Sequence, residues 1–237
     1  MGSQGYKSLR RLRNLEIVDL SENAFTNSIF PFLSAATSLK SLFLGNNRMV
    51  GSFPVDELKY LTNLELLDLR INRFNGSTPV QEVSALRKLN ALDLSDNEFS
   101  SSTELQGICK MKNMQELDLS GNKLVGNLQS LKYLSLVDNN FDNLSKLRVL
   151  ILGSKSKSFQ VESKSFWKPK FRLSHIALPS CNLEKVPHFL QYQKDLSHID
   201  LSDNKISGIF PHWLLVNNTK LESLLLQNNS FTSFQLP

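Results

Sequence analysis

Residues 86–97 read LRKLNALDLSDN, and this phrase decides the fold. It follows the pattern LxxLxxLxLxxN, with its last two leucines at Leu92 and Leu94 and its asparagine at Asn97. The alternation LxL points both leucine side chains to one face of a short strand and the intervening residue to the other face. A strand of this length cannot bury its leucine face alone, so the phrase predicts neighbouring strands of the same kind.

The same phrase recurs along the chain. Measured at the first apolar residue of each LxL pair, the copies stand about 24 or 25 residues apart, except for two steps of 17 and 16 residues. Residues 1–237 are therefore predicted to form a single α/β repeat domain. The domain is a leucine-rich-repeat solenoid, wound as a right-handed superhelix, with a parallel sheet on the concave face and an irregular or 3-10 convex side. The ten expected strands lie near Val18, Leu42, Leu67, Leu92, Leu117, Leu134, Leu150, Ile176, Ile199 and Leu224.

The residue that closes each phrase is expected to hold the turn after the strand. An asparagine side chain can bond backbone groups of the adjacent turn, so a ladder of asparagines is predicted along the solenoid. At Cys181 a thiol takes this place, and we expect a buried structural cysteine there rather than a reactive one. The other cysteine is Cys109, and two cysteines are too few for a disulfide framework or a structural metal site.

Composition and motifs narrow the class of function. The chain is 41% hydrophobic and 21% charged, which is typical of a soluble domain with a packed core. Its net charge of +5 comes from scattered lysines and arginines, so no nucleic-acid partner is predicted. The sequence has no apolar run long enough to cross a bilayer and no GxSxG, Walker, GxGxxG or HExxH motif. We therefore expect a binding protein with no catalytic residues, cofactor or metal and no direct membrane insertion.

Several copies of the phrase share further residues. Residues 114–126 read MQELDLSGNKLVG and residues 196–208 read LSHIDLSDNKISG, and glycine and proline follow the asparagine in three copies. This wording, LxxLxxLDLSxNxLxGxIP, resembles the plant extracellular class of leucine-rich repeats. The stretch from Ser180 onward is similar, more specifically, to plant receptor-like proteins, which are cell-surface receptors without a kinase.

The resemblance implies a location and partners. It implies an ectodomain on the extracellular side of the plasma membrane, a peptide or protein ligand, and signalling through a receptor kinase co-receptor in defence or development. Members of the family open with a signal peptide and a cysteine-bearing cap and carry one membrane helix, and this sequence shows none of the three. The two short steps also suggest lost segments near Asn127 and Asp142. We therefore expect a fragment, a truncated product or a faulty gene model.

The concave face of such a solenoid is its usual binding side. Its outward positions include an acidic stripe that would attract a basic peptide, although aspartate is also the consensus residue there. His175 and His198 stand in one column of adjacent strands, about 5 Å apart at the backbone, where they would titrate together, share a ligand or simply be solvated. The candidate binding residues are Phe43, Asp68, Arg70, Asp93, Asp118, Tyr133, His175, His198 and Asp200.

Two further features concern the surface. Residues 154–170 form an irregular basic insertion, which is either a binding loop or a tolerated extended repeat. Four Asn-x-Ser/Thr sequons mark candidate N-glycosylation sites, although about that many arise by chance in a chain so rich in serine. The sequon asparagines are Asn75, Asn143, Asn217 and Asn228.

The leading prediction is ligand recognition by the extracellular region of a receptor-like protein. Three alternatives stay open on the sequence alone. Soluble plant inhibitors of fungal wall-degrading enzymes use the same repeat class but keep both cysteine caps. An intracellular leucine-rich-repeat interaction module would typically lack the LxGxIP wording. A non-functional remnant of a receptor gene is the third alternative.

Overall fold

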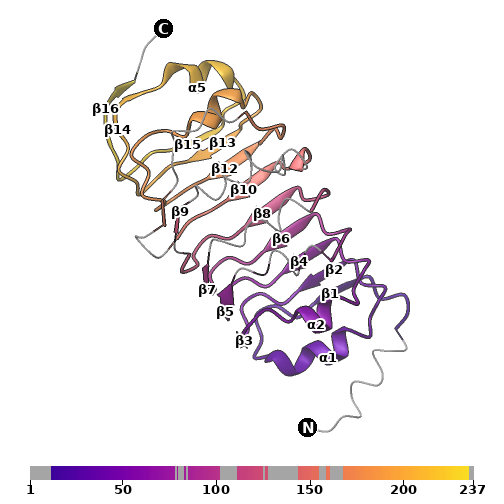
Figure 1. Ribbon diagram of the computed structural model, residues 1–237. Helices are drawn as coiled ribbons and strands as arrows, with labels where there is room; N and C mark the ends of the chain where they lie inside the picture. Colours follow the sequence, from indigo (N-terminus) through magenta and orange to yellow (C-terminus); the bar gives the residue numbers. More distant parts are fainter. Residues whose placement is uncertain are drawn as a thin grey trace.

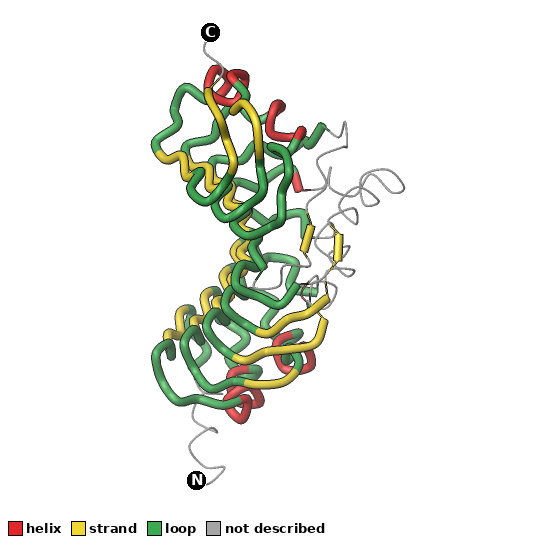
Figure 2. The backbone as a smooth tube through the Cα atoms, turned by 90° about the vertical axis from the view of Figure 1, so that its left-hand side faces the viewer, coloured by secondary structure: helices red, strands yellow, loops and turns green. Residues whose placement is uncertain are grey.

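The computed structural model describes residues 12–77, 79, 83, 85–101, 111–124, 126–127, 144–154, 159–160 and 168–234. Its coils stack into an arc, and the two termini lie at opposite ends (Figure 1). One short strand of each coil lies along the inner side of the arc (Figure 2). The predicted leucine-rich-repeat solenoid is therefore confirmed.

The inner strands form one parallel sheet. Within the described residues it has nine strands, in the order β1-β2-β4-β6-β8-β10-β12-β13-β15. Neighbouring strands are in register, so that the central apolar residues align, as Leu42 does with Leu67 and Leu67 with Leu92. Strict register follows from the LxL alternation, because a shift of one residue would turn every leucine to solvent. The strands are β1 (Ile17–Asp19), β2 (Ser41–Phe43), β4 (Leu66–Asp68), β6 (Ala91–Asp93), β8 (Glu116–Asp118), β10 (Val149–Ile151), β12 (His175–Ala177), β13 (His198–Asp200) and β15 (Ser223–Leu225).

The order of strands near the middle of the sheet corrects one expectation. The repeat pattern placed a strand at Leu134 between those at Leu117 and Leu150, whereas β8 pairs directly with β10 and aligns Leu117 with Leu150. Leu134 itself lies outside the described residues. The physical reason is the spacing: steps of 17 and 16 residues are each too short for one coil, and β8 and β10 are instead joined by a single step of 33 residues.

The outer side of the coils carries short secondary elements. Gly76 adopts φ +82°, a backbone conformation that favours glycine, where the pairing of β5 with β7 shifts register. In the described ranges, the outer strands form three small sheets, β3-β5-β7, β9-β11 and β14-β16. Helical turns follow at several coils, as expected for an irregular or 3-10 convex side. These elements are η2 (Asn27–Ile29), α1 (Phe30–Leu33), β3 (Val50–Gly51), α2 (Val55–Leu58), β5 (Arg73–Ser77), β7 (Glu98–Ser101), β9 (Gly126–Asn127), β11 (Phe159–Gln160), η5 (His188–Tyr192), β14 (Ser207–Phe210), α5 (His212–Asn217) and β16 (Ser230–Phe234).

Leucines fill the space between the inner and outer sides. Leu42, Leu67 and Leu92 are almost completely buried, and each such side chain contributes about 2 kcal/mol when removed from water. Phenylalanines run beside them: the ring centroids of Phe74 and Phe99 lie 6.4 Å apart with nearly parallel planes. The core is therefore one continuous column, to which every described coil contributes.

The predicted asparagine ladder is present. In Asn97 the side-chain amide donates to the carbonyl oxygens of Leu69 and Leu94, at 3.0 and 3.2 Å, and its oxygen accepts from the N–H of Phe74 at 3.0 Å. Cys181 takes the ladder position in its own coil, with its sulfur 3.3 Å from the carbonyl oxygen of Leu152. Its side chain is fully buried, and burial raises the pKa of the thiol to about 12. The expectation of a buried structural cysteine is confirmed.

Candidate binding surface

The first and third residues of each inner strand point away from the leucine core. They form two columns that run across the concave face, because successive residues of a strand point to opposite sides. Register brings equivalent positions of neighbouring coils side by side, as it does for Asp68 and Asp93. The concave face is therefore a continuous surface whose side chains can vary without changing the core.

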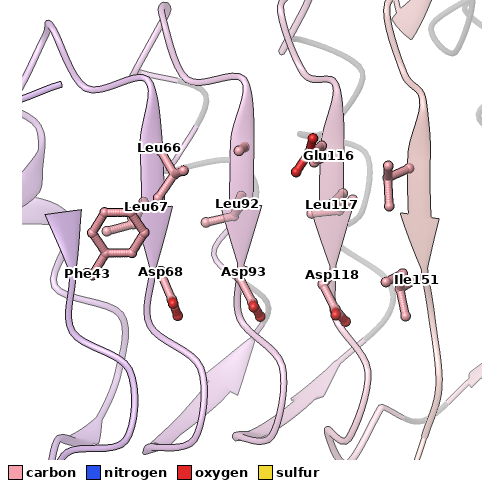
Figure 3. Close-up of a pocket in the computed structure, with 12 residues that line it drawn as sticks. Phe43, Leu66, Leu67, Asp68, Leu92, Asp93, Glu116, Leu117, Asp118 and Ile151 are labelled. Atoms are coloured by element: carbon pink, nitrogen blue, oxygen red, sulfur yellow. The ribbon is translucent and has the colours of Figure 1, made fainter. Parts of the chain in front are cut away.

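A hollow of about 230 Å³ opens on the N-terminal half of this face. Figure 3 shows the carboxylates of Asp68, Asp93 and Asp118 in a row along successive strands, with Phe43 and Ile151 at its two ends. The structure thus brings four predicted residues together, Phe43 and the three aspartates. The hollow is lined by Phe43, Leu66, Leu67, Asp68, Ala91, Leu92, Asp93, Glu116, Leu117, Asp118, Val149 and Ile151.

The aspartates of the row have a structural role as well as a place on the concave face. Oδ1 of Asp118 accepts from the N–H and the hydroxyl of Ser120, at 2.8 and 2.7 Å, and so holds the turn after the strand. Asp93 makes the same pair of bonds to Ser95. These repeated bonds support the interpretation that aspartate is the consensus residue here because its Oδ1 holds the turn. Burial raises the pKa of the Asp68 and Asp118 carboxyl groups, because the charged form is partly removed from water.

Arg70 partly neutralises the acidic row. Its Nε lies 3.4 Å from Oδ2 of Asp68, and its Nη1 lies 4.0 Å from Oδ2 of Asp93. Gly45 makes room for it, since a Cβ atom on Gly45 would lie 3.1 Å from Cγ of Arg70. Arg70 also borders a second hollow of about 360 Å³ next to the first one. In the part of the chain that the structure describes, no cationic side chain forms an ion pair with Asp118.

His175 and His198 lie on the C-terminal half of the face, outside both hollows. Their rings stack, with centroids 4.1 Å apart and planes 11° from parallel. Each Nδ1 is hydrogen-bonded to the hydroxyl of the preceding serine, Ser174 at 2.8 Å and Ser197 at 2.9 Å. Desolvation by burial, followed by repulsion from His198, lowers the pKa of His175. The predicted column of two histidines is therefore a direct ring contact.

The remaining predicted residues are placed elsewhere or outside the described ranges. Oδ1 of Asp200 accepts from the N–H of Ser202 at 2.8 Å, which repeats the consensus role. Tyr133 lies outside the described residues, as does most of the basic insertion at 154–170. At the end of that insertion, the amine of Lys168 lies 5.6 Å from the ring centroid of Tyr192.

The sequon asparagines differ in accessibility. Asn75 is exposed on β5, on the outer side of the coils. Asn228 is exposed but donates to Oδ1 of Asp203 at 2.7 Å. Asn217 is half-buried and donates to the carbonyl oxygen of Gln191 at 3.1 Å. Asn143 lies outside the described residues.

Sequence reasoning missed the apolar wall of the first hollow. Leu66, Val149 and Ile151 line it, and none of them was selected as a candidate, because aliphatic residues at outward positions carry no chemical signature of their own. The sequence marked them only as apolar residues at outward strand positions that are usually polar in these repeats. Nothing in the pattern showed that Val149 and Ile151 would lie beside β8, since the repeat count placed another strand there.

The described residues contain no group of three histidine, cysteine or acidic side chains arranged to hold a metal ion. Across the same residues, no helix has the length and apolar character needed to cross a membrane.

Comparisons with known proteins agree with this architecture. Residues 195–216 match a family model described as Leucine Rich Repeat, and residues 110–128 match a second leucine-rich-repeat model. Over 285 residues the chain is 58% identical to Receptor-like protein 13 of Arabidopsis thaliana, and over 287 residues it is 59% identical to Receptor-like protein 15 of the same plant. Both alignments cover 99% of this chain. It belongs to the plant receptor-like proteins of the leucine-rich-repeat class. The predicted family is confirmed, and the family is non-enzymatic.

The match to the receptor-like proteins covers only part of each relative. The chain spans 27% of the length of Receptor-like protein 13 and 30% of that of Receptor-like protein 15. This chain therefore corresponds to a portion of the repeat region of a receptor-like protein.

Solved structures show the same fold. A leucine-rich-repeat protein of Leptospira interrogans superposes with a TM-score of 0.71 at 24% identity and covers 96% of this chain and 52% of its own. The Arabidopsis receptor kinase HAESA, solved with the peptide hormone IDA and the co-receptor SERK1, has a TM-score of 0.56 at 19% identity, covering 94% of this chain and 39% of its own. At these identities the similarity establishes the fold alone.

Proposed function

We propose that this receptor-like chain recognises a peptide or protein ligand on its concave face, as part of a receptor on the extracellular side of the plasma membrane. The observation that carries the proposal is the first hollow, which places half-buried carboxylates against apolar walls on the sheet. Such a mixture of an apolar surface with a few oriented polar groups is characteristic of ligand sites. The receptor would act in defence or developmental signalling.

The signalling partner belongs to the same proposal. This chain shares its fold with HAESA, whose structure holds both a peptide hormone and a co-receptor. A receptor-like protein has no kinase of its own, so recognition must be passed to a partner that has one. We therefore assign the concave face to the ligand and propose a receptor kinase as the co-receptor. Glycans on exposed asparagines such as Asn75, on the outer side, would leave the concave face free.

A displayed random peptide library, selected against the purified chain, tests the concave-face assignment. Asp93→Arg places a cation in the hollow, and we expect it to weaken the selected peptides at least about tenfold, which corresponds to about 1.4 kcal/mol. The control is Lys59→Glu, a charge reversal of equal size on the exposed end of α2, and it should change binding less than about twofold. A selection that enriches no peptide, or equal losses in both variants, overturns the proposal.

A further inference from the structure

The step between β8 and β10 differs from the others in this solenoid. Adjacent inner strands are separated by 24 residues at Val18 and Leu42 and by 25 at Leu67 and Leu92, but by 33 at Leu117 and Leu150. Even so, the backbone hydrogen bonds of the parallel sheet continue across this step. The N–H of Leu119 donates to the carbonyl oxygen of Ile151 at 3.0 Å, and the N–H of Val149 donates to that of Gln115 at 3.0 Å.

Two relatives carry internal residues that this chain lacks. The alignments with Receptor-like proteins 13 and 15 extend over 285 and 287 residues, whereas this chain has 237. At least 48 and 50 residues of those relatives, the two differences, therefore have no counterpart here. Since 99% of this chain is aligned, the unmatched residues are internal, and their number equals about two coils of the usual length.

The direct pairing of β8 with β10 sets the neighbours of β8. Glu116 is opposite Val149, and Asp118 is opposite Ile151. The end of the hollow is therefore built from both sides of this junction.

The two sides of the junction have complementary chemistry. Asp118 is partly desolvated, and its Oδ1 accepts hydrogen bonds from Ser120. It lies beyond the ion pairs of Arg70, which reach Asp68 and Asp93. Across the junction, Val149 and Ile151 supply an aliphatic surface. A cationic side chain would restore the interactions that the Asp118 carboxylate loses on burial, and an adjacent apolar side chain would cover the aliphatic surface.

We infer that the hollow at the β8–β10 junction is a recognition pocket, and that it takes an extended peptide carrying a lysine or arginine and, two residues away, an aliphatic or aromatic side chain. Residues two apart in an extended peptide lie on one side, about 7 Å apart, which suits a cation at Asp118 and an apolar group on the far wall. This inference rests on the proposed function and adds the chemistry of the ligand.

The experiment uses the full chain, peptides selected from the displayed library, and three variants. Asp118→Asn removes the charge and keeps the shape, and it should weaken the selected peptides at least about tenfold. Asp19→Asn is the matched control: Asp19 has the same consensus position and bonds the N–H of Ser21 at 2.9 Å, but it lies outside the hollow. It should change binding less than about twofold.

In the third variant, Ile151→Thr removes part of the aliphatic surface at the end of the hollow, and it should also weaken the selected peptides. Binding unchanged in Ile151→Thr, or equal effects of Asp118→Asn and Asp19→Asn, overturns the inference and leaves the proposed function standing. A library that enriches no peptide at all overturns both.

Discussion

The imidazole rings of His175 and His198 stack 4.1 Å apart on the concave face, and Oε2 of Glu222 lies 3.9 Å from Nε2 of His198. Besides desolvation by burial, which is the larger cause, charge repulsion between the two rings lowers the pKa of His175.

The histidine pair predicts a pH dependence of stability. The folded pKa of His175 is lowered below its ordinary value of about 6.5, so the unfolded chain binds this proton more readily. The contribution of neutral His175 to stability is therefore fully present above about pH 6.5 and is lost as pH falls from there through the lower folded pKa. Thermal melts at several pH values should show this loss.

His198→Gln tests the cause of the shift. Removing the neighbouring ring should raise the pKa of His175 toward its ordinary value, and NMR titration of the histidine ring protons measures it directly. His212→Gln, which changes a histidine in α5, is the control and should leave His175 unaffected. A pKa of His175 that stays the same in His198→Gln would contradict the ring contact.

The asparagine ladder predicts a difference between buried and exposed members. Asn97→Ala removes four hydrogen bonds in a buried turn and leaves backbone groups of two coils unpaired, so unfolding should become easier by about 2–4 kcal/mol. Asn23→Ala, at the exposed first member, loses bonds only to Leu20 and Ser21 and should cost less than about 1 kcal/mol. Urea denaturation compares the two, and similar midpoints would argue against the ladder as a source of stability.

Cys181 is predicted to be inert in the folded chain. Its thiol is fully buried with a pKa of about 12, so the reactive thiolate is scarce at neutral pH. Alkylation by iodoacetamide, followed by mass spectrometry of the peptide that contains Cys181, should be slow in buffer and rapid in concentrated urea. Labelling in buffer at the rate of a free exposed thiol would show that this coil is open.

The phenylalanine column predicts a large loss of stability at one position. Phe74→Ala should destabilise the chain by about 3–5 kcal/mol, because the fully buried ring packs between Phe30 and Phe99 and would leave a cavity. Ile209→Ala is the control, since this side chain is 61% exposed and its loss should cost less than about 0.5 kcal/mol. A calorimetric melt that ranks Ile209→Ala as the more damaging would contradict the packing.

The periodic residues made the fold predictable, and the local departures from the period did not. Leu92, Leu94 and Asn97 each have one structural role that repeats in most coils, so one phrase predicts strand, core and turn together. Which strands become neighbours depends on how a long link is accommodated, and counting from Leu117 to Leu134 could not reveal the pairing with Leu150.

The candidate site was predictable in part for the same reason. Asp68, Asp93 and Asp118 could be assigned to the concave face from their place beside the strand leucines. The apolar wall formed by Val149 and Ile151 depends on the β8–β10 junction, which is a tertiary feature. The ring contact of His175 and His198 was predicted as a shared column, but the stacking geometry also depends on Ser174 and Ser197, which hold each Nδ1.

The asparagine ladder also has a direction. The side-chain oxygen of Asn72 accepts from the N–H of Met49, that of Asn97 from Phe74, and that of Asn122 from Phe99, so each asparagine holds the coil that precedes it. Detaching a coil therefore removes a hydrogen-bond acceptor from its N-terminal neighbour. The neighbour on the C-terminal side keeps the acceptor that the next asparagine supplies. A force applied at the C-terminal end would release the coils one after another, each made easier to open by the loss of the one before.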